Sequence, residues 1–315
     1  MTLPISIVIP TYNRAQLLAR FLPTYFADGC SEVIIVDDAS SEPVESVLVG
    51  SGFKAPGGTR LQVIRNPRHL QQPRSRMIGV EAASHPYIFF GEDDAYLSPG
   101  HIKTLFDFVA TGGPDAAASY WLTTTVVEPD PLASCSLPCG SSAADFVNLW
   151  EFTLRADLRI SQPTMVPWLH TLALIRKELL IREGFDPNYR GNAFREETDF
   201  YLRAYHHGAK LYLVDAPPAF HYKGQYNSAG GQHGRASFQS FLIYEHWVAR
   251  NNYYFLRKNA DAVRSLRHML SPFFETALYM LRRGLGYPGR FRFELRRRLG
   301  TARTIGATRR DEMSA

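Results

Sequence analysis

The first ninety residues alternate short apolar runs, rich in β-branched side chains, with longer amphipathic segments. Alternation of this kind is typical of a mostly parallel β-sheet flanked by helices. The sequence therefore predicts an α/β fold. The expected strands cover residues 5–9, 33–36, 61–64 and 87–90, and the expected helices cover residues 15–27 and 74–83.

Three of these expected strands run directly into polar residues. Residues 10–14 read Pro-Thr-Tyr-Asn-Arg, Asp37 and Asp38 follow the second strand, and residues 92–94 read Glu-Asp-Asp. In open α/β sheets, ligands bind beyond the carboxyl ends of the strands. We therefore expect these polar residues to converge on one edge of the sheet and to form a binding site there.

The rest of the chain continues the pattern and then changes character. Residues 1–235 are expected to form the catalytic domain, and residues 236–315 a helical, basic C-terminal region. Residues 128–142, rich in Pro, Ser and Cys, are expected to form a loop or flap. The further expected elements are a helix over 99–109, a strand over 117–122, a strand entering a helix over 168–180, a helix over 196–207 and a strand over 210–214.

Composition excludes several classes of protein. With 45% hydrophobic residues, the 315-residue chain can bury a full core, so it is not a disordered protein. It has no run of about 20 apolar residues and no signal peptide at its N-terminus, so a cytoplasmic location is expected. Cys135 and Cys139 lack a second Cys/His pair at zinc spacing and are interpreted as free thiols.

Basic residues are concentrated near the C-terminus. Residues 257–315 carry 14 Lys/Arg and 5 Asp/Glu, a net charge of +9, whereas the rest of the chain is at −4. One interpretation is a solvated basic tail. The other is attraction to a polyanionic acceptor or to an anionic membrane at its inner face, where each basic residue contributes about 1 kcal/mol. No nucleic acid partner is expected.

The acidic cluster Glu92-Asp93-Asp94 requires a positive counter-charge, because neighbouring carboxylates raise one another's pKa. Hard oxygen ligands on a tight turn suit Mn²⁺ or Mg²⁺ bridging a diphosphate. The alternative is a helix cap, in which Asp94 or Ser98 precedes a helix beginning near Pro99. Asp38, which ends another strand in a similar way, favours the binding site.

Four segments together resemble the family 2 glycosyltransferases, which have the GT-A fold: SIVIPTYNR, VIIVDDAS, SRMIGVEAASHPYIFFGEDD and FREETDFYLRAYHHGAKLYLVDAPPAFHY. The resemblance covers roughly residues 4–225. It implies an inverting, metal-dependent hexosyltransferase that uses a nucleotide-sugar donor, with UDP favoured. The acceptor is an unidentified hydroxyl compound, whether a saccharide, a lipid-linked molecule or a small molecule, and cell-surface polysaccharide or glycoconjugate synthesis is an expected setting.

The resemblance also implies roles at the donor end of the site. Asp38 accepts a hydrogen bond from the base, and Arg76 lies near the diphosphate or ribose. Met77 stands where the family more often has Asn, and Arg74 is the alternative for this contact. Tyr12 can stack on a pyrimidine; the alternative is a half-buried core aromatic. The residues expected to line the base pocket are Pro10, Thr11, Tyr12 and Arg14.

For the metal, the resemblance makes Asp94 a ligand and Asp93 a ribose or metal contact. Glu92 is an extra ligand or an exposed acid. His221 matches a late histidine that reaches the metal or diphosphate in some relatives; the alternative is a packing residue.

Glu197 occupies the place of the catalytic base, with Glu196 beside it. The alternative is that both belong to an acidic first turn that stabilises a helix. Trp168 and His170 are candidate acceptor contacts or parts of a buried strand, and Trp121 and Trp150 are assigned to the core. Residues 224–234 are a candidate donor loop.

Two other functions compete with the glycosyltransferase hypothesis. A nucleotidyltransferase would also use acidic metal ligands, but the first strand leads into Pro-Thr-Tyr-Asn-Arg and not into a Gly-rich phosphate loop. A non-catalytic module could bind a nucleotide, a polyanion or a membrane through its basic end. Such purely electrostatic binding would weaken steeply with salt.

Overall fold

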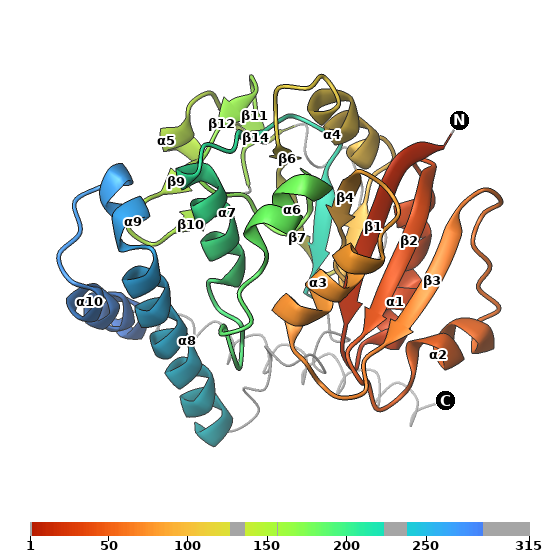
Figure 1. The fold of residues 1–315 in the computed structure, drawn as a ribbon, viewed down its shortest axis with the longest axis horizontal. Coiled ribbons are helices and arrows are strands. Elements are labelled where there is room, and N and C mark those ends of the chain that lie inside the picture. The colour runs from red at the N-terminus through yellow and green to blue at the C-terminus, as the bar shows by residue number, and fades with distance from the viewer. Residues whose placement is uncertain (1, 127–135, 156, 224–237, 286–315) are drawn as a thin grey trace, which may run out of the picture. The chain divides into compact units, whose positions relative to one another are not determined.

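The computed structural model describes residues 2–126, 136–155, 157–223 and 238–285 (Figure 1). The chain divides into two compact units, Met1–His268 and Met269–Ala315. The described part of the second unit contains helix α10 (Pro272–Leu285). The division into a catalytic domain over 1–235 and a C-terminal region over 236–315 stays a proposal, and the first compact unit extends past residue 235 to include helices α8 and α9.

An eight-stranded sheet forms the centre of the first unit. In spatial order its strands are β12 (Thr164–Met165), β14 (Leu211–Leu213), β6 (Ala116–Ala118), β13 (Ala173–Arg176), β4 (Tyr87–Phe90), β1 (Leu3–Thr11), β2 (Cys30–Asp37) and β3 (Arg60–Arg65). The four strands from β4 to β3 are parallel, whereas β13 runs antiparallel to both of its neighbours. The mixed α/β sheet flanked by helices confirms the predicted fold class.

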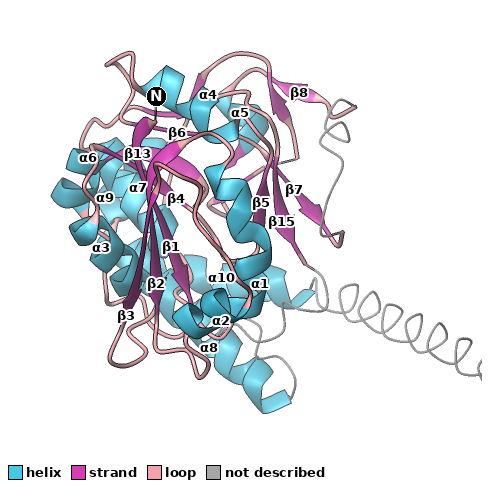
Figure 2. Cartoon of the chain, turned by 90° about the vertical axis from the view of Figure 1, so that its right-hand side faces the viewer, coloured by secondary structure: helices cyan, strands magenta, loops and turns pink. Residues whose placement is uncertain are grey.

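Helices cover both faces of this sheet (Figures 1 and 2). Helix α3 packs on β1 and β2, on the face opposite α1 and α2. A Cβ on Gly79 of α3 would lie 2.3 Å from Val8 Cγ1, so glycine permits this close approach. The helices of the first unit are α1 (Ala15–Phe21), η1 (Leu22–Phe26), α2 (Val44–Gly50), α3 (Gln72–Ala82), α4 (His101–Val109), α5 (Ala143–Phe146), α6 (Lys177–Glu183), α7 (Glu196–His206), α8 (Phe238–Lys258) and α9 (Ala260–Leu266).

A second sheet has three strands, β5 (Ala95–Leu97), β15 (Ala219–Tyr222) and β7 (Trp121–Thr124). Strand β15 runs antiparallel to β5 and parallel to β7. Two short pairs complete the strands of the described residues, β8 (Cys139–Gly140) with β11 (Arg159–Ile160) and β9 (Val147–Asn148) with β10 (Thr153–Leu154). The single strand expected over residues 117–122 is therefore wrong in detail, since β6 and β7 belong to different sheets.

The core explains why β1 reads as an unbroken apolar run. Residues 5–9 are fully buried, as expected for a strand covered on both faces. The one polar side chain among them, Ser6, donates a 2.5 Å hydrogen bond to Glu32 on β2. The helix expected over residues 15–27 changes to a 3-10 helix at Leu22, because Pro23 cannot donate to an α-helical hydrogen bond.

Some of the remaining predictions on loops and thiols fall on residues that the structure describes, and the others fall outside them. Cys139 is a free, exposed thiol, as predicted, whereas Cys135 lies outside the described residues. The candidate donor loop over residues 224–234 and part of the flap over 128–142 also lie outside them. No helix in the described part of the chain has both the length and the apolar character that crossing a membrane requires.

Candidate active site

The predicted site residues meet at the carboxyl ends of β1, β2 and β4, around a cavity of about 480 Å³. Of the residues predicted to bind the donor or the metal or to act as the base, Arg76 alone is absent from the cavity wall. The other predicted residues on the wall are Pro10, Thr11, Tyr12, Arg14, Asp38, Asp93, Asp94, Glu196, Glu197 and His221, and Glu92 lies beside them. The convergence on one sheet edge is therefore observed in the structure.

The acidic turn after β4 is held by Tyr25. Its hydroxyl donates to the carbonyl of Glu92 at 2.7 Å and accepts from the Glu92 amide at 2.9 Å. A Cβ on Gly91 would lie 2.7 Å from Tyr25 Cε1 and 2.8 Å from Ile9 Cγ1, so only glycine fits before the turn. The tight packing fixes the direction in which the three carboxylates leave the strand.

Glu92, Asp94 and His221 form a cluster that fits a divalent cation. One ligand atom from each lies within 4.8 Å of the other two, and His221 Nε2 is 3.2 Å from Asp94 Oδ2. The antiparallel pairing of β15 with β5 aligns His221 with Ala95 and so places the imidazole beside Asp94. Two carboxylates and an imidazole are a suitable donor set for Mn²⁺ or Mg²⁺.

Asp93 lies outside this cluster. Its Oδ2 accepts a 2.7 Å hydrogen bond from Thr11, and its Oδ1 lies 2.9 Å from Arg14 Nη1. The same guanidinium nitrogen is 3.0 Å from Asp94 Oδ2. The geometry thus favours Glu92 over Asp93 as the third ligand, in contrast to the ranking drawn from sequence.

Burial makes the acidic turn a costly place for negative charge. It raises the pKa of Glu92 to about 7 and that of Asp93 to about 6. Burial alone would lower the pKa of His221, but the hydrogen bond with Asp94 and the charge of Glu92 raise it. A bound cation would relieve this accumulation of carboxylates.

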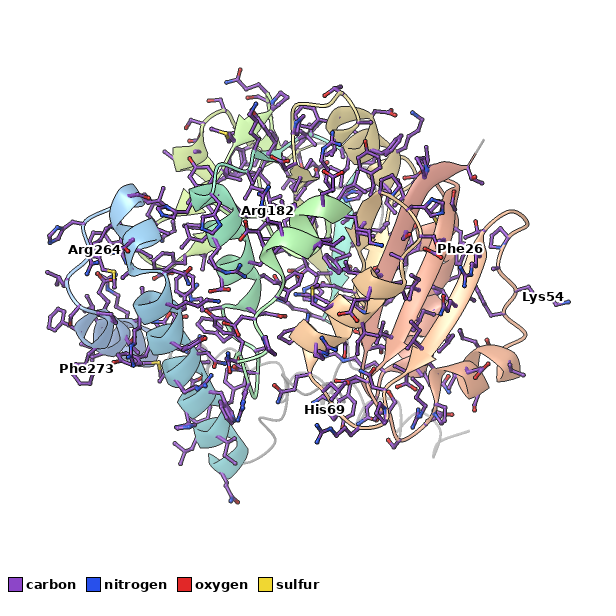
Figure 3. The ribbon with its side chains drawn as sticks, in the orientation of Figure 1. Phe26, Lys54, His69, Arg182, Arg264 and Phe273 are labelled. Atoms are coloured by element: carbon purple, nitrogen blue, oxygen red, sulfur yellow. The ribbon has the colours of Figure 1, made fainter. Side chains whose placement is uncertain are left out.

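At the other end of the cavity, Tyr12 stacks on His69, with ring centroids 4.1 Å apart and an interplanar angle of 31°. His69, labelled in Figure 3, lies in the loop after β3 and places Nδ1 2.8 Å from Asp38 Oδ2. Tyr12 is thus a half-buried residue on the cavity wall, and not a member of the core. A flat pair of rings at this position can extend its stack onto a nucleobase.

Asp38 organises that same loop. Its carboxylate accepts hydrogen bonds of 2.8 Å from the Asn66 side chain and from the amides of Leu70 and Gln71. Gln71 has a φ of 72°, a strained value for a non-glycine residue. Asp38 therefore stabilises the loop that carries His69, a role that the sequence did not indicate, and its bond to the base stays a proposal.

Arg76 lies beneath the cavity wall and is completely buried. Its Nη1 is 2.9 Å from Glu196 Oε1 and its Nη2 is 2.7 Å from Glu197 Oε1. The guanidinium also packs 5.2 Å from the ring centroid of Phe185. This burial favours a role in holding the two glutamates over direct contact with a diphosphate.

The pKa values of Glu196 and Glu197 shift in opposite directions. Burial raises the pKa of Glu196 to about 8, against the opposing charge of Arg76. Burial would also raise the pKa of Glu197, but Arg76 and hydrogen bonds from Thr171 and Arg76 lower it. The Glu197 side chain is 29% exposed and that of Glu196 is 4% exposed, so the ionised carboxylate is also the accessible one.

The turn before α7 holds this pair in place. Ala193 and Arg195 have φ values of 51° and 76°, strained for residues with a Cβ. The buried Arg195 side chain donates to Asn252 of α8 at 3.0 Å and to the carbonyl of Phe152 at 2.9 Å. These bonds fix the start of α7, and Arg195 is a site-supporting residue that sequence reasoning missed.

Aromatic residues line the cavity near Glu197. Trp121 and His170 form an edge-to-face pair with centroids 4.2 Å apart, and Phe194 and Tyr244 also reach the wall. Trp168 is buried instead and is not on the wall. The assignment of Trp150 to the core was wrong: it is 56% exposed, and its ring lies 4.5 Å from the Arg267 guanidinium carbon.

Solved structures of the Staphylococcus aureus protein TarS share the fold. TarS 1–349 aligns at 13% identity and a TM-score of 0.52, with 85% of this chain and 83% of that chain covered. The complex of TarS 1–349 with UDP-GlcNAc aligns at 14% identity and a TM-score of 0.50, with 85% and 74% covered. A further TarS structure aligns at 15% identity and a TM-score of 0.50, and this chain spans only 39% of it.

The mixed α/β sheet flanked by helices is a GT-A-like architecture. Residues 6–133 match the family described as Glycosyl transferase family 2. This match supports a glycosyltransferase and confirms the resemblance found in the sequence over residues 6–133. A search of curated proteins gave no significant match.

Proposed function

We propose that this enzyme transfers a sugar from a nucleoside diphosphate sugar, with UDP favoured, to an acceptor hydroxyl and inverts the anomeric configuration. One observation carries the proposal: the cation cluster, the Tyr12 ring and the ionised Glu197 carboxylate line a single cavity. The TarS complex with UDP-GlcNAc, which has the same fold, supports the choice of donor.

In the proposed reaction, Glu197 acts as the general base. Its Oε1 accepts hydrogen bonds from Arg76 and Thr171, which leaves Oε2 for the acceptor hydroxyl. As the acceptor oxygen bonds to the anomeric carbon, its proton passes to Oε2. The bond between that carbon and the diphosphate oxygen breaks on the opposite face, and its electrons leave with the nucleoside diphosphate.

Glu92, Asp94 and His221 would hold a divalent cation, Mn²⁺ or Mg²⁺. Such an ion supplies positive charge that stabilises the diphosphate as a leaving group. Arg14 adds a protein charge beside the same carboxylates, 3.0 Å from Asp94. Pro10, Thr11 and Tyr12 would then form the wall against which the base is held.

The acceptor and the cellular setting complete the proposal. The aromatic side of the cavity, at Trp121 and Phe194, is suited to the apolar face of a sugar ring, which favours a saccharide or a lipid-linked saccharide. We place the enzyme in the cytoplasm, in cell-surface polysaccharide or glycoconjugate synthesis.

The donor can be tested by thermal denaturation with a panel of nucleotide sugars, each with and without Mn²⁺. A ligand that binds only the native state raises the apparent stability, by about 2.7 kcal/mol at a hundred times its Kd. We expect the largest shift with a UDP-sugar in the presence of Mn²⁺. The absence of a shift with every donor would contradict the proposal.

A further inference from the structure

Helix α10 carries an exposed apolar stripe along one side. At about 100° per residue, five of its positions, residues 273, 274, 277, 281 and 284, fall within about 100° of arc. Three of the five are large hydrophobic side chains in contact with solvent. They are Phe273, 76% exposed, Phe274, 53% exposed, and Leu281, 60% exposed, with the small exposed Ala277 between them. Figure 3 labels Phe273 on this helix.

The charged residues of the helix lie away from this stripe. Arg282 and Arg283 lie about 130° to either side of its centre, whereas Glu275 lies about 150° away. Leu270, 57% exposed, precedes the helix, and its amide donates a 3.0 Å hydrogen bond to Glu275 Oε1. The single carboxylate of the helix is therefore engaged on the polar side, and both arginines also lie on the half of the helix that faces away from the stripe.

We propose that this stripe, consisting of Phe273, Phe274, Ala277 and Leu281, docks on an anionic lipid bilayer. An in-plane helix buries its apolar face at the boundary of headgroups and acyl chains and keeps its polar face in water. The sequence that follows, residues 286–315, adds eight arginines against three acidic residues. Basic residues at such a surface each contribute about 1 kcal/mol.

Charge favours this occupant over a second copy of the chain. Two copies meeting through this helix would bring together basic segments of the same sign, whereas phosphatidylglycerol supplies the opposite charge. Nucleic acid is bound largely through phosphate contacts, for which the stripe itself provides no basic side chain. The described helix has 14 residues and does not meet the requirement for a membrane span, so the contact is peripheral.

Vesicle flotation of the full chain tests the proposal. The vesicles are phosphatidylcholine alone, or phosphatidylcholine mixed with phosphatidylglycerol. We expect binding to the anionic vesicles only, weakening as salt is raised, and a loss of about tenfold or more in F273S/F274S. F273L/F274L should retain binding, as should V49S/I181S, which removes two equally exposed apolar residues on α2 and α6.

Several results would overturn the proposal: equal binding to neutral vesicles, no binding to anionic ones, or unchanged binding in F273S/F274S. Dissociation of an oligomer in that variant would assign the stripe to a second copy, and loss of bound nucleic acid would assign it to RNA or DNA. UDP release without vesicles should be unchanged in F273S/F274S, so a failure of docking can be told apart from a failure of the proposed transfer activity.

Discussion

Arg76 donates a 2.7 Å hydrogen bond from Nη2 to Oε1 of Glu197, from a position with no exposed surface. The second guanidinium nitrogen binds Glu196. One buried cation thus serves two carboxylates, which differ in exposure and in pKa. This arrangement separates an ionised, accessible glutamate from a protonated, buried one.

Replacing Arg76 with Met should destabilise the fold by about 3–5 kcal/mol, because it leaves the ionised Glu197 without its buried cation and the buried Glu196 carboxyl without its donor. Urea denaturation measures the difference. Arg74→Met is the matched control, since Arg74 lies on the same helix with a side chain that is 51% exposed. We expect that control to remain within about 0.5 kcal/mol of wild type. Equal stability of the two variants would contradict the proposal that Arg76 holds the two glutamates in place.

Glu196 should make stability depend on pH. Its pKa is raised in the folded protein from 4.5 to about 8, so the folded state binds its proton more tightly than the unfolded state does. The resulting stability is fully present below about pH 4.5 and is lost as the pH rises toward 8. Thermal melts of wild type and E196Q across this window should therefore converge at low pH, and wild type should lose stability relative to E196Q as the pH rises. Parallel curves would contradict the assignment.

The metal cluster predicts which acid matters most for cation binding. Glu92→Gln should raise the Mn²⁺ concentration needed for half-maximal stabilisation with UDP by about tenfold or more. Loss of even a residue that only contacts a metal ligand lowers metal affinity by about tenfold or more. Asp93→Asn should have a smaller effect, because Asp93 binds Thr11 and Arg14 instead. Thermal shift titrations with Mn²⁺ measure the effect of each substitution. A larger effect of Asp93→Asn than of Glu92→Gln would make Asp93 the ligand.

Tyr12 should hold the base of the donor. Stacking of a base on an aromatic ring is worth about 1–3 kcal/mol, so Tyr12→Ala should weaken UDP binding by roughly 5- to 150-fold. Tyr12→Phe keeps the ring and should bind as wild type does. Tyr253→Ala, on the exposed surface of α8, serves as the control. Calorimetry with UDP distinguishes these cases, and unchanged affinity in Tyr12→Ala would place the base elsewhere.

Much of the fold could be predicted from the sequence, because each strand of the N-terminal half is marked by a short apolar run in its own residues. Apolar runs such as residues 5–9 end in polar residues at a fixed edge, so the sequence alone brought Asp38, Asp94 and Tyr12 together. The register of β15 against β5 is a long-range property. Its consequence, the contact between His221 and Asp94, could be proposed by resemblance but not deduced from spacing.

The residue roles that the sequence did not predict correctly depend on where each side chain points and on how deeply it is buried. Glu92, Asp93 and Asp94 are adjacent in the chain, and Tyr25 holds the backbone of this turn. In the folded turn Glu92 and Asp94 lie beside His221, whereas Asp93 binds Thr11 and Arg14. Arg76 lies on a helix whose apolar pattern is weak, so its complete burial was not visible. Trp150, expected in the core, lies on the surface beneath Arg267.

The central claim is that Glu197 acts as the base of sugar transfer, and the most direct test is the rate of UDP release from the donor that stabilises the protein most. Glu197→Gln should lower the rate by about 10²- to 10⁴-fold while donor affinity stays at the wild-type level. Glu196→Gln, which replaces a carboxyl that is already protonated at neutral pH, should stay within about tenfold of wild type. Wild-type turnover in Glu197→Gln, or abolished turnover in Glu196→Gln alone, would contradict the account.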